Sequence, residues 1–593
     1  MTHKTHSSIG TVRRYVYVFV LLAIVTIAWC AAYRRWTPQA WATPVAYSGD
    51  ALGGLVGAKA MARGEIMPIL PKFPPSLGAP FAANWNDYPT TEEGTLAWSA
   101  LLARVFGVFS GLNLTLLSAH LLAAGSFYSV CRYLRYEPLF ALLGAALFAL
   151  SRYSFTRSLG HLTLTFYWHI PLGLLVIAWC LSAAPRWPAR SKLVFSIGVS
   201  ILFGVQSPYY SWLFAQFLFL AAGICFLRGP RRSAWWPLAL AVTVFVTFVL
   251  MNADTFYSRY ALGPNPGAIA SRSFPDLERY ALKPIELIIP STHRISALQA
   301  WGAKAYFQQA LFLGEVGPPY LGFIAIISGL VLIYRTMIAL AQGVTGKIPS
   351  EFWSIGWICA YSVVGGIGAL GGVAGLILFR CSNRYSIVIL ALLLLFFVRE
   401  LTKLARRWPY LGKVTVTGAL LAIGLFDQLP RFFTAQDVAV ARWQVGADRS
   451  LVSAMERKLP AGAMVFQLPV VDFPESPPTV DMSDYEEFRP YLHSRSLRFS
   501  YGSDKGRYRE RWQKEVEQTS VLAMVQALEN YGFNAILLDR GGYKDSGAAL
   551  VASLKDVGRA TIIAESYRFI AIELHPTAHP VLPPELDVTA RRD

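Results

Sequence analysis

Cysteine is scarce in this chain, and acidic residues are scarce in its first 429 positions. Six cysteines occur among 593 residues, all in or beside hydrophobic segments and none after residue 429: Cys30, Cys131, Cys180, Cys225, Cys359 and Cys381. This pattern excludes a disulfide framework. Residues 1–429 contain 34 Lys and Arg but only 14 Asp and Glu. Residues 430–593 contain 20 Lys and Arg and 22 Asp and Glu. The net charge of +18 therefore comes from the first part of the chain.

Residues 430–593 also lack the local patterns that mark many enzymes. They show no convincing order of Ser, His and Asp, no glycine-rich phosphate loop and no metal-ligand spacing. The charged run at 504–511 is typical of an exposed face. The sequence therefore favours an accessory role for this part of the chain.

Hydrophobic sequence is abundant instead. Hydrophobic residues make up 54% of the chain and the mean hydropathy is +0.40, which is the composition of a polytopic membrane protein. A basic membrane half indicates contacts with anionic lipid or phosphate rather than with nucleic acid. Eleven segments are candidate spans: about 14–33, 112–133, 137–152, 164–184, 191–206, 209–227, 234–252, 317–340, 353–371, 383–399 and 411–428.

The distribution of Lys and Arg predicts how these spans are oriented. Arg13 and Arg14 precede the first span, so the positive-inside rule places the N-terminus in the cytoplasm. The loops after the even-numbered spans are all basic, as this orientation requires. We therefore expect a multi-pass protein of a bacterial inner membrane, with the N-terminus cytoplasmic and the C-terminal domain periplasmic.

The predicted fold class is a polytopic α-helical membrane protein with about 11 transmembrane helices and a small C-terminal α/β domain. Residues 1–429 are expected to form the transmembrane domain, with outer loops at about 34–111 and 253–316. Residues 430–593 are expected to form the extracytoplasmic domain, because helix-like stretches alternate with short strand patterns. These strand patterns lie at 464–471, 534–539, 561–564 and 568–574.

Carboxylates at the outer face are the candidates for a general base. Asp50 follows the first span in Tyr47-Ser48-Gly49-Asp50, and Asp87 lies in Asn84-Trp85-Asn86-Asp87-Tyr88-Pro89. Structural roles are the alternatives, since Asp50 could cap a helix that begins at Ala51 and Asp87 could belong to a turn. Nine other acids lie at or beyond this face: Glu65, Glu92, Glu93, Asp254, Asp276, Glu278, Glu286, Glu315 and Asp427.

Basic residues at the outer face break the positive-inside bias, which makes them candidates for binding an anion. Arg157 and His161 follow the third span, His293 lies in the second long loop, and Arg380 and Arg384 lie at the mouth of the tenth span. The planar fork of Arg suits pairs of phosphate oxygens. We therefore predict a site for a phosphate headgroup; the alternative is that Arg380 and Arg384 snorkel to lipid headgroups.

Aromatic and amide side chains near the same face suggest a sugar-binding site. Trp85 and Asn86 lie in the first outer loop, and Tyr209 begins the sixth span. An aromatic ring covers the apolar face of a sugar, while Asn and Asp hydrogen-bond its hydroxyls.

The chain resembles the GT-C integral-membrane glycosyltransferases, and more narrowly their bacterial YfhO-like branch. The resemblance lies in a Gly-Asp pair in the first outer loop, two long outer loops, about eleven spans and an outer C-terminal domain. It implies a polyprenyl-phosphate sugar donor, with Asp50 as base or metal ligand. Asp87 is a separate candidate, as a second carboxylate or metal ligand. Contributing segments are Ser48-Gly49-Asp50, Asn84-Trp85-Asn86-Asp87-Tyr88-Pro89, Pro284-Ile285-Glu286-Leu287-Ile288-Ile289-Pro290 and Glu315-Val316-Gly317-Pro318-Pro319-Tyr320-Leu321-Gly322.

The implied activity is inverting transfer of a sugar to a glycan or lipid acceptor of the cell envelope, with the C-terminal domain covering the site or binding the acceptor. A divalent metal (Mg or Mn) would be held by Asp50 and Asp87, although a single Asp rather than an Asp-Asp pair leaves this open. Glu286 and His293 are further substrate-binding candidates. Three alternatives remain: a lipid-linked-sugar transporter or flippase, a non-catalytic partner in polysaccharide assembly, and an outer-face ligase or phosphotransferase.

Overall fold

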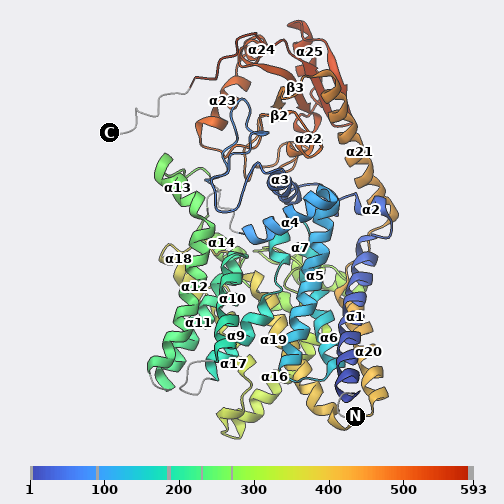
Figure 1. The fold of residues 1–593 in the computed structure, drawn as a ribbon, viewed down its shortest axis with the longest axis vertical. Helices are drawn as coiled ribbons and strands as arrows, with labels where there is room; N and C mark the ends of the chain where they lie inside the picture. The colour runs from blue at the N-terminus through green and yellow to red at the C-terminus, as the bar shows by residue number, and fades with distance from the viewer. Residues whose placement is uncertain (1–4, 88–91, 183–188, 229–230, 269–271, 585–593) are drawn as a thin grey trace. The chain divides into compact units, whose positions relative to one another are not determined.

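The computed structural model describes residues 5–87, 92–182, 189–228, 231–268 and 272–584 and divides into two compact units (Figure 1). The first unit comprises Met1–Trp36, Leu116–Phe248 and Arg272–Thr434. The second comprises Thr37–Thr115, Val249–Ser271 and Ala435–Asp593. The sequence-based division placed one boundary at residue 429, whereas the second unit also includes most of the first outer loop and the start of the second.

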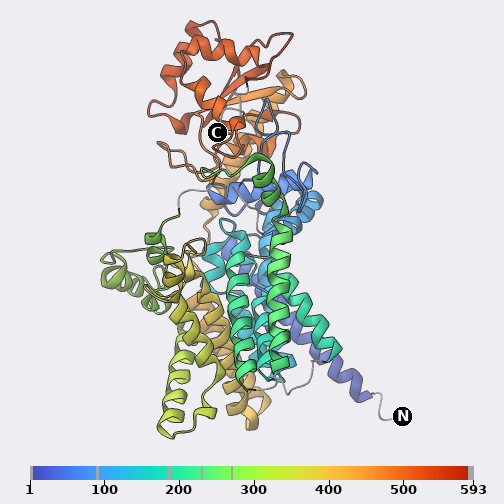
Figure 2. The ribbon, with the colours of Figure 1, turned by 90° about the vertical axis from the view of Figure 1, so that its left-hand side faces the viewer.

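The first unit is helical, and a helix overlaps each of the eleven predicted spans. Its long helices run side by side (Figure 2), and α9, α10 and α11 contact one another. The α-helices are α1 (Thr5–Tyr33), α5 (Val108–Tyr133), α6 (Pro138–Ala149), α7 (Arg152–Arg157), α8 (Leu162–Thr165), α9 (Ile170–Leu181), α10 (Arg190–Gly204), α11 (Pro208–Arg228), α12 (Trp235–Met251), α14 (Phe274–Arg279), α15 (Ser296–Gly302), α16 (Phe323–Ala341), α17 (Ser350–Ser362), α18 (Ile367–Val373), α19 (Ser386–Leu404) and α20 (Tyr410–Gln428).

Fewer of these helices are long and apolar enough to cross a bilayer than the eleven predicted. Among the described residues six qualify, or seven if α12 and the following α13 (Ala253–Leu262), bent by 55°, count as one span. Helices α9, α10 and α17 have 12, 15 and 13 residues. At 1.5 Å per residue they reach roughly 18–23 Å, less than a ~30 Å hydrocarbon core. The chain is a multi-pass membrane protein in which a helix lies over each predicted span, and the shorter of these helices do not reach across a hydrocarbon core of that thickness on their own.

Helix α6 forms the centre of the first unit. It contains no polar side chain, begins with Pro138, and buries eleven of its twelve residues. Helices α1, α19 and α20 all contact it. A Cβ at Gly144 would lie 2.6 Å from Cγ2 of Val398 and 2.9 Å from Cε1 of Phe127. Small residues therefore let neighbouring helices approach closely, which is how helices associate where water supplies no driving force.

The second unit contains the predicted α/β domain, built on a five-stranded sheet in the order β2-β1-β3-β5-β4. Strands β1, β2 and β3 are parallel, while β5 pairs antiparallel with β3 and β4. The strands are β1 (Met464–Leu468), β2 (Arg498–Phe499), β3 (Phe533–Asp539), β4 (Ile562–Glu565) and β5 (Phe569–Glu573). The four predicted strands correspond to β1, β3, β4 and β5. The two-residue β2 escaped prediction because it is too short to show a period.

Helices from distant parts of the chain complete the second unit. They are α2 (Pro38–Trp41), α3 (Asp50–Ala62), α4 (Glu93–Phe106), α13, α21 (Ala435–Lys458), α22 (Phe488–His493), α23 (Tyr508–Glu517), α24 (Val521–Asn530) and α25 (Ala548–Asp556). Phe466, Ile536 and Ile572 of the sheet pack on Trp512 of α23 and Leu528 of α24. The sheet therefore has a hydrophobic core of its own.

Residues of the first outer loop extend the sheet at β2. Ala79 N donates to Phe499 O at 2.9 Å, and Phe499 N donates to Ser76 O at 3.0 Å. An unpaired edge strand is a template for aggregation, so this loop also protects the edge.

Lys59 of α3 is buried against α22 and should make stability depend on pH. Its Nζ donates to the backbone oxygens of Tyr491 and Ser494, and burial together with the charge of Arg63 lowers the pKa of Lys59 to about 7. The unfolded chain keeps that proton up to about pH 10.4. The free energy of unfolding should therefore rise between about pH 7 and pH 10, by a few kcal/mol, since one pKa unit is about 1.4 kcal/mol.

Thermal unfolding of the wild type, Lys59→Met and Lys555→Met at pH 7 and pH 9 measures this dependence. Lys555 is exposed on α25 and serves as the matched control. Lys59→Met should lose most of the rise and Lys555→Met should keep it. An equal rise in all three proteins would show that other groups cause it.

Candidate functional site

Two arginines of the first unit converge on one carboxylate. Arg157 Nη2 donates to Glu315 Oε2 at 2.6 Å, and Arg384 Nη2 donates to Glu315 Oε1 at 2.6 Å. Arg384 Nε adds a longer bond of 3.3 Å to Oε2. The exposed fractions of the side chains are 2% for Arg157, 17% for Glu315 and 15% for Arg384. We call these three residues the arginine cluster.

Short elements next to long helices position the arginine cluster. Arg157 ends α7, which follows directly on the buried helix α6. Arg384 lies in a 3₁₀ turn, η5 (Ser382–Tyr385), which leads into α19. Asn383 of this turn donates to Glu315 O at 3.4 Å and so ties the turn to the loop before α16. The cluster is thus attached to packed helices at three points.

The charges of the arginine cluster do not cancel, because two guanidinium groups face one carboxylate. Burial alone would raise the pKa of Glu315, but Arg157 and Arg384 hold it far below its usual value. Glu315 is therefore ionised at every physiological pH. A net positive charge remains in a largely desolvated place, which favours an anionic ligand.

Tyr209 and His161 flank the arginine cluster. The Arg384 guanidinium lies 4.4 Å from the centre of the Tyr209 ring, in cation–π geometry. Burial and the charges of Arg157 and Arg384 lower the pKa of His161 to about 4, so its imidazole is neutral at pH 7. Four residues predicted from the sequence (Arg157, His161, Tyr209 and Arg384) are therefore brought together.

A tyrosine network holds Arg157 from the other side. Its guanidinium lies 5.3 Å from the centre of the Tyr153 ring, and the Tyr153 and Tyr210 hydroxyls are 2.8 Å apart. Tyr210 donates in turn to Leu164 O at 2.8 Å. Within the described part of the chain, Arg157 Nε is buried without a hydrogen-bond partner. That N–H remains available to a further acceptor.

The other predicted residues of the first unit have separate partners. Arg380 pairs with Asp276 at 3.0 Å, and His293 Nε2 lies 3.0 Å from Asp427 Oδ1. Glu286 is buried and accepts from the Tyr306 hydroxyl at 3.1 Å. Burial raises the pKa of Glu286. None of these contacts involves the arginine cluster.

The predicted carboxylates belong to the second unit and differ in environment. Asp50 is exposed in the first turn of α3, directly after Gly49, whose φ of 55° is left-handed. Asp87 is buried, and its two oxygens accept from Arg507 at 2.6 and 2.8 Å. Burial alone would raise the pKa of Asp87, but Arg507 and Asn265 hold it below its usual value.

Trp85 and Asn86, predicted to bind sugar, are buried in the loop that they stabilise. Trp85 Nε1 donates to Gly502 O at 2.5 Å, and its ring packs on Phe473. Asn86 accepts from Lys72 N at 2.7 Å and donates to Lys72 O at 3.0 Å. These contacts are typical of a structural role, and a sugar-binding role for either residue stays a prediction.

The donor set does not fit a metal held jointly by Asp50 and Asp87. Both oxygens of Asp87 are occupied by Arg507, and a positive guanidinium would repel a cation there. Across the residues that the structure describes, no group of three or more His, Cys, Asp or Glu side chains could hold a metal ion.

Solved structures similar to this chain include three glycosyltransferases. ArnT from Cupriavidus metallidurans, bound to undecaprenyl phosphate, is 14% identical (TM-score 0.43; 94% of this chain, 97% of that chain). The arabinofuranosyltransferase AftD from Mycobacteria is 13% identical, with a TM-score of 0.46, and the match covers 96% of this chain and 42% of that chain. The Archaeoglobus fulgidus oligosaccharyltransferase, in its apo form, is 11% identical, with a TM-score of 0.41, and the match covers 88% of this chain and 69% of that chain.

No protein-family model matches the chain, and no curated protein matches it in sequence. TM-scores below 0.5 and identities of 11–14% are too low to assign a family. The GT-C resemblance and the narrower YfhO-like branch therefore stay predictions. What the structure establishes is a multi-pass membrane protein with a separate α/β unit and, in its membrane part, a buried cluster of excess positive charge.

Proposed function

We propose that this protein is a membrane glycosyltransferase that uses a sugar carried on a polyprenyl phosphate. The observation that carries the proposal is the arginine cluster, in which Arg157 and Arg384 share a single carboxylate. We assign this cluster to the phosphate of the lipid-linked donor. The GT-C resemblance of the sequence supplies the reaction class.

The geometry of the arginine cluster suits a phosphate group. Guanidinium groups bind pairs of phosphate oxygens through parallel N–H bonds. Arg157 Nε has no acceptor among the described residues, and a phosphate oxygen could occupy that place. The neutral imidazole of His161 adds no further charge. A donor phosphate would thus meet a fixed excess of positive charge with little water to displace.

The proposed chemistry is a single inverting displacement. The acceptor hydroxyl attacks the anomeric carbon, a glycosidic C–O bond forms, and the C–O bond to the lipid phosphate breaks. The acceptor proton passes to a general base, and the polyprenyl phosphate leaves with its electron pair. Arg157 and Arg384 stabilise the charge that develops on the leaving phosphate. Asp50, in the second unit, is the base that the sequence predicts, and it is tested by substitution.

The location and acceptor complete the proposal. The protein would act at the periplasmic face of a bacterial inner membrane and transfer its sugar to an envelope glycan or lipid. The location rests on the distribution of Lys and Arg along the chain. The acceptor rests on the GT-C resemblance.

The test is an envelope glycan profile in a deletion strain that carries wild type, Asp50→Asn or Asp556→Asn at matched expression. Loss of a general base should lower the transfer rate by about 100-fold or more, so one glycan species should disappear with Asp50→Asn. Asp556 is an exposed acid on α25 and should complement fully.

Two other outcomes would change the proposal. Full complementation by Asp50→Asn would remove Asp50 as the base. A deletion strain with an unaltered envelope glycan profile would argue against a glycosyltransferase of the envelope altogether.

A further inference from the structure

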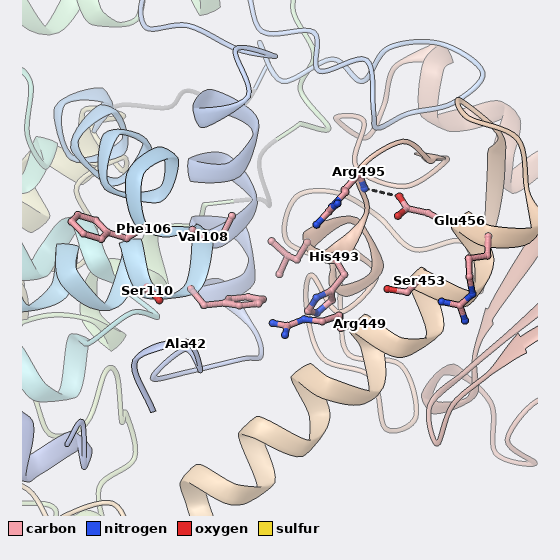
Figure 3. A pocket seen from close by; sticks show the side chains of 13 residues that line it. Ala42, Phe106, Val108, Ser110, Arg449, Ser453, Glu456, His493 and Arg495 are labelled. Carbon is pink, nitrogen blue, oxygen red and sulfur yellow. Dashed lines mark hydrogen bonds between the residues drawn. The ribbon is translucent and has the colours of Figure 1, made fainter. Parts of the chain in front are cut away.

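The second unit contains an open pocket of about 690 Å³ that the proposed transfer reaction does not use (Figure 3). This volume is within the usual range for a small-molecule site, about 300–1,000 Å³. One wall comes from α2 and from the turn between α4 and α5, and the other from α21 and the end of α22. The lining includes Val108, Phe109, Arg449, Glu456, His493 and Arg495.

Helix α21 makes one wall strongly basic. Arg449, Ser453, Glu456 and Arg457 follow one another at steps of four, three and one residues, which places them on one face of the helix. Arg495 approaches from the segment after α22, on the same side of the pocket (Figure 3). No salt bridge of Arg449, Arg457 or Arg495 is found within the described residues.

Glu456 is the one acid among the described residues that line the pocket, and its carboxylate is already engaged. Its Oε1 accepts from the backbone N–H groups of Arg495 at 2.6 Å and Ser496 at 2.9 Å. It also accepts from the Ser494 hydroxyl at 2.9 Å. Glu456 therefore shapes the segment that carries Arg495 and leaves the three guanidinium groups without a carboxylate partner in the lining.

Groups behind the pocket keep His493 neutral. His493 Nε2 lies 2.9 Å from the Tyr47 hydroxyl, which donates to Asp448 Oδ2 at 2.9 Å. Arg489 Nε donates to the same carboxylate at 2.8 Å. Burial, with the charges of Arg449, Lys59 and Arg489, lowers the pKa of His493 to about 3. The imidazole is neutral at pH 7 and lies where positive charge is concentrated.

The opposite wall is apolar. Ala42, Val108 and Phe109 line it, and the Phe109 ring centre lies 5.5 Å from that of His493. Figure 3 shows Val108 and Ser110 across the pocket from Arg449 and His493. A ligand that fits has a charged side toward α21 and a less polar side toward α5. A sugar ring with an anionic substituent has this character, because the faces of the ring are less polar than its edge.

We propose that this pocket binds an anionic saccharide, with its carboxylate or phosphate on Arg449 and Arg495 and its ring against Val108 and Phe109. This site is additional to the proposed donor site, and it is tested by binding, without turnover.

The test measures dissociation constants for full-length protein in nanodiscs of neutral phosphatidylcholine. The probes are a mannuronate tetrasaccharide, glucose 1-phosphate and, as the neutral control, maltotetraose. The two anionic probes distinguish a carboxylate from a phosphate ligand. We expect saturable binding of at least one of them that weakens as salt rises, and no binding of maltotetraose.

Substitutions locate the binding. Arg449→Gln combined with Arg495→Gln should weaken it about tenfold or more, since each removes a charged hydrogen-bond donor. Arg442→Gln is the matched control, because Arg442 is an exposed arginine of α21 outside the lining. Ser453→Trp, which fills the pocket and keeps every arginine, should weaken binding as well and covers the case in which the double variant does not fold.

Three results would overturn the proposal: no saturable binding of either anionic probe, an equal loss with Arg442→Gln, or unchanged binding in Ser453→Trp. Arginine-dependent binding to phosphatidylglycerol vesicles without any saccharide binding would identify a lipid-surface contact instead, and would also overturn it.

Discussion

Replacing Arg384 by alanine is expected to weaken binding of a polyprenyl phosphate by about 10- to 100-fold. Arg384 supplies one of the two guanidinium groups on Glu315, and a hydrogen bond to a charged group contributes about 1.5–3 kcal/mol. Each 1.4 kcal/mol corresponds to about a factor of ten in affinity. The measurement is the dissociation constant of purified protein in nanodiscs for the unglycosylated lipid phosphate.

Replacing Glu315 by glutamine should lower the dissociation constant for the lipid phosphate, the opposite of the effect of Arg384→Ala. The substitution removes the negative charge that partly neutralises Arg157 and Arg384, so a phosphate should bind more tightly, at some cost in stability. The exposed Arg335, which pairs with Glu400 in the same unit, supplies the control Arg335→Ala. If Arg384→Ala and Glu315→Gln both weaken binding, the cluster maintains structure and is not a phosphate site.

Replacing Lys72 by methionine is expected to reduce the free energy of unfolding by about 3–5 kcal/mol. Lys72 Nζ lies 2.7 Å from Glu93 Oε1 and also pairs with Asp254 Oδ2. The exposed fraction of all three side chains is 2% or less. Without the lysine, two carboxylates would remain buried with no cation, and desolvated charges of this kind are among the most costly groups in a protein.

Thermal unfolding of Lys72→Met against Lys555→Met measures this loss. The loss should shrink toward pH 5, because buried carboxylates without their lysine bind a proton more tightly in the folded than in the unfolded chain, and burial already raises the pKa of Glu93. Adding Glu93→Gln to Lys72→Met should recover part of the stability. An unfolding temperature equal to that of Lys555→Met would show that the triad contributes little.

The sequence predicted one side of the arginine cluster but not the other. Arg157 and Arg384 were recognisable because arginines at the outer ends of spans break the positive-inside bias. Glu315 was one of eleven outer acids and began a segment that contributes to the GT-C resemblance, but nothing in the sequence paired it with either arginine. Glu315 is separated in sequence from Arg157 by 158 residues and from Arg384 by 69 residues. Only the packing of the helices brings the three side chains together.

Long-range pairing also explains the failure at residues 504–511. Their charges predicted an exposed face, yet Asp504 is fully buried and Arg507 binds Asp87 across 420 residues. A run of charges looks the same in sequence whether water or a distant carboxylate satisfies it. Helix positions, in contrast, depend on hydrophobic composition within a short window, so all eleven were located even though several helices are short.

The pairing of residues 76–79 with β2 has a consequence for how the chain matures. Phe499 is synthesised 420 residues after Ala79, an interval of roughly 20–80 s at 5–20 residues per second. During that time Lys72 of the first outer loop lacks its ion-pair partner Asp254 until α13 has been synthesised. Ala79 lacks its hydrogen-bond partner Phe499 until β2 has been synthesised. The segment that contains β2 therefore completes a structure begun by the first outer loop, and residues 76–79 remain without this backbone pairing until the helices between them and β2 have been translated.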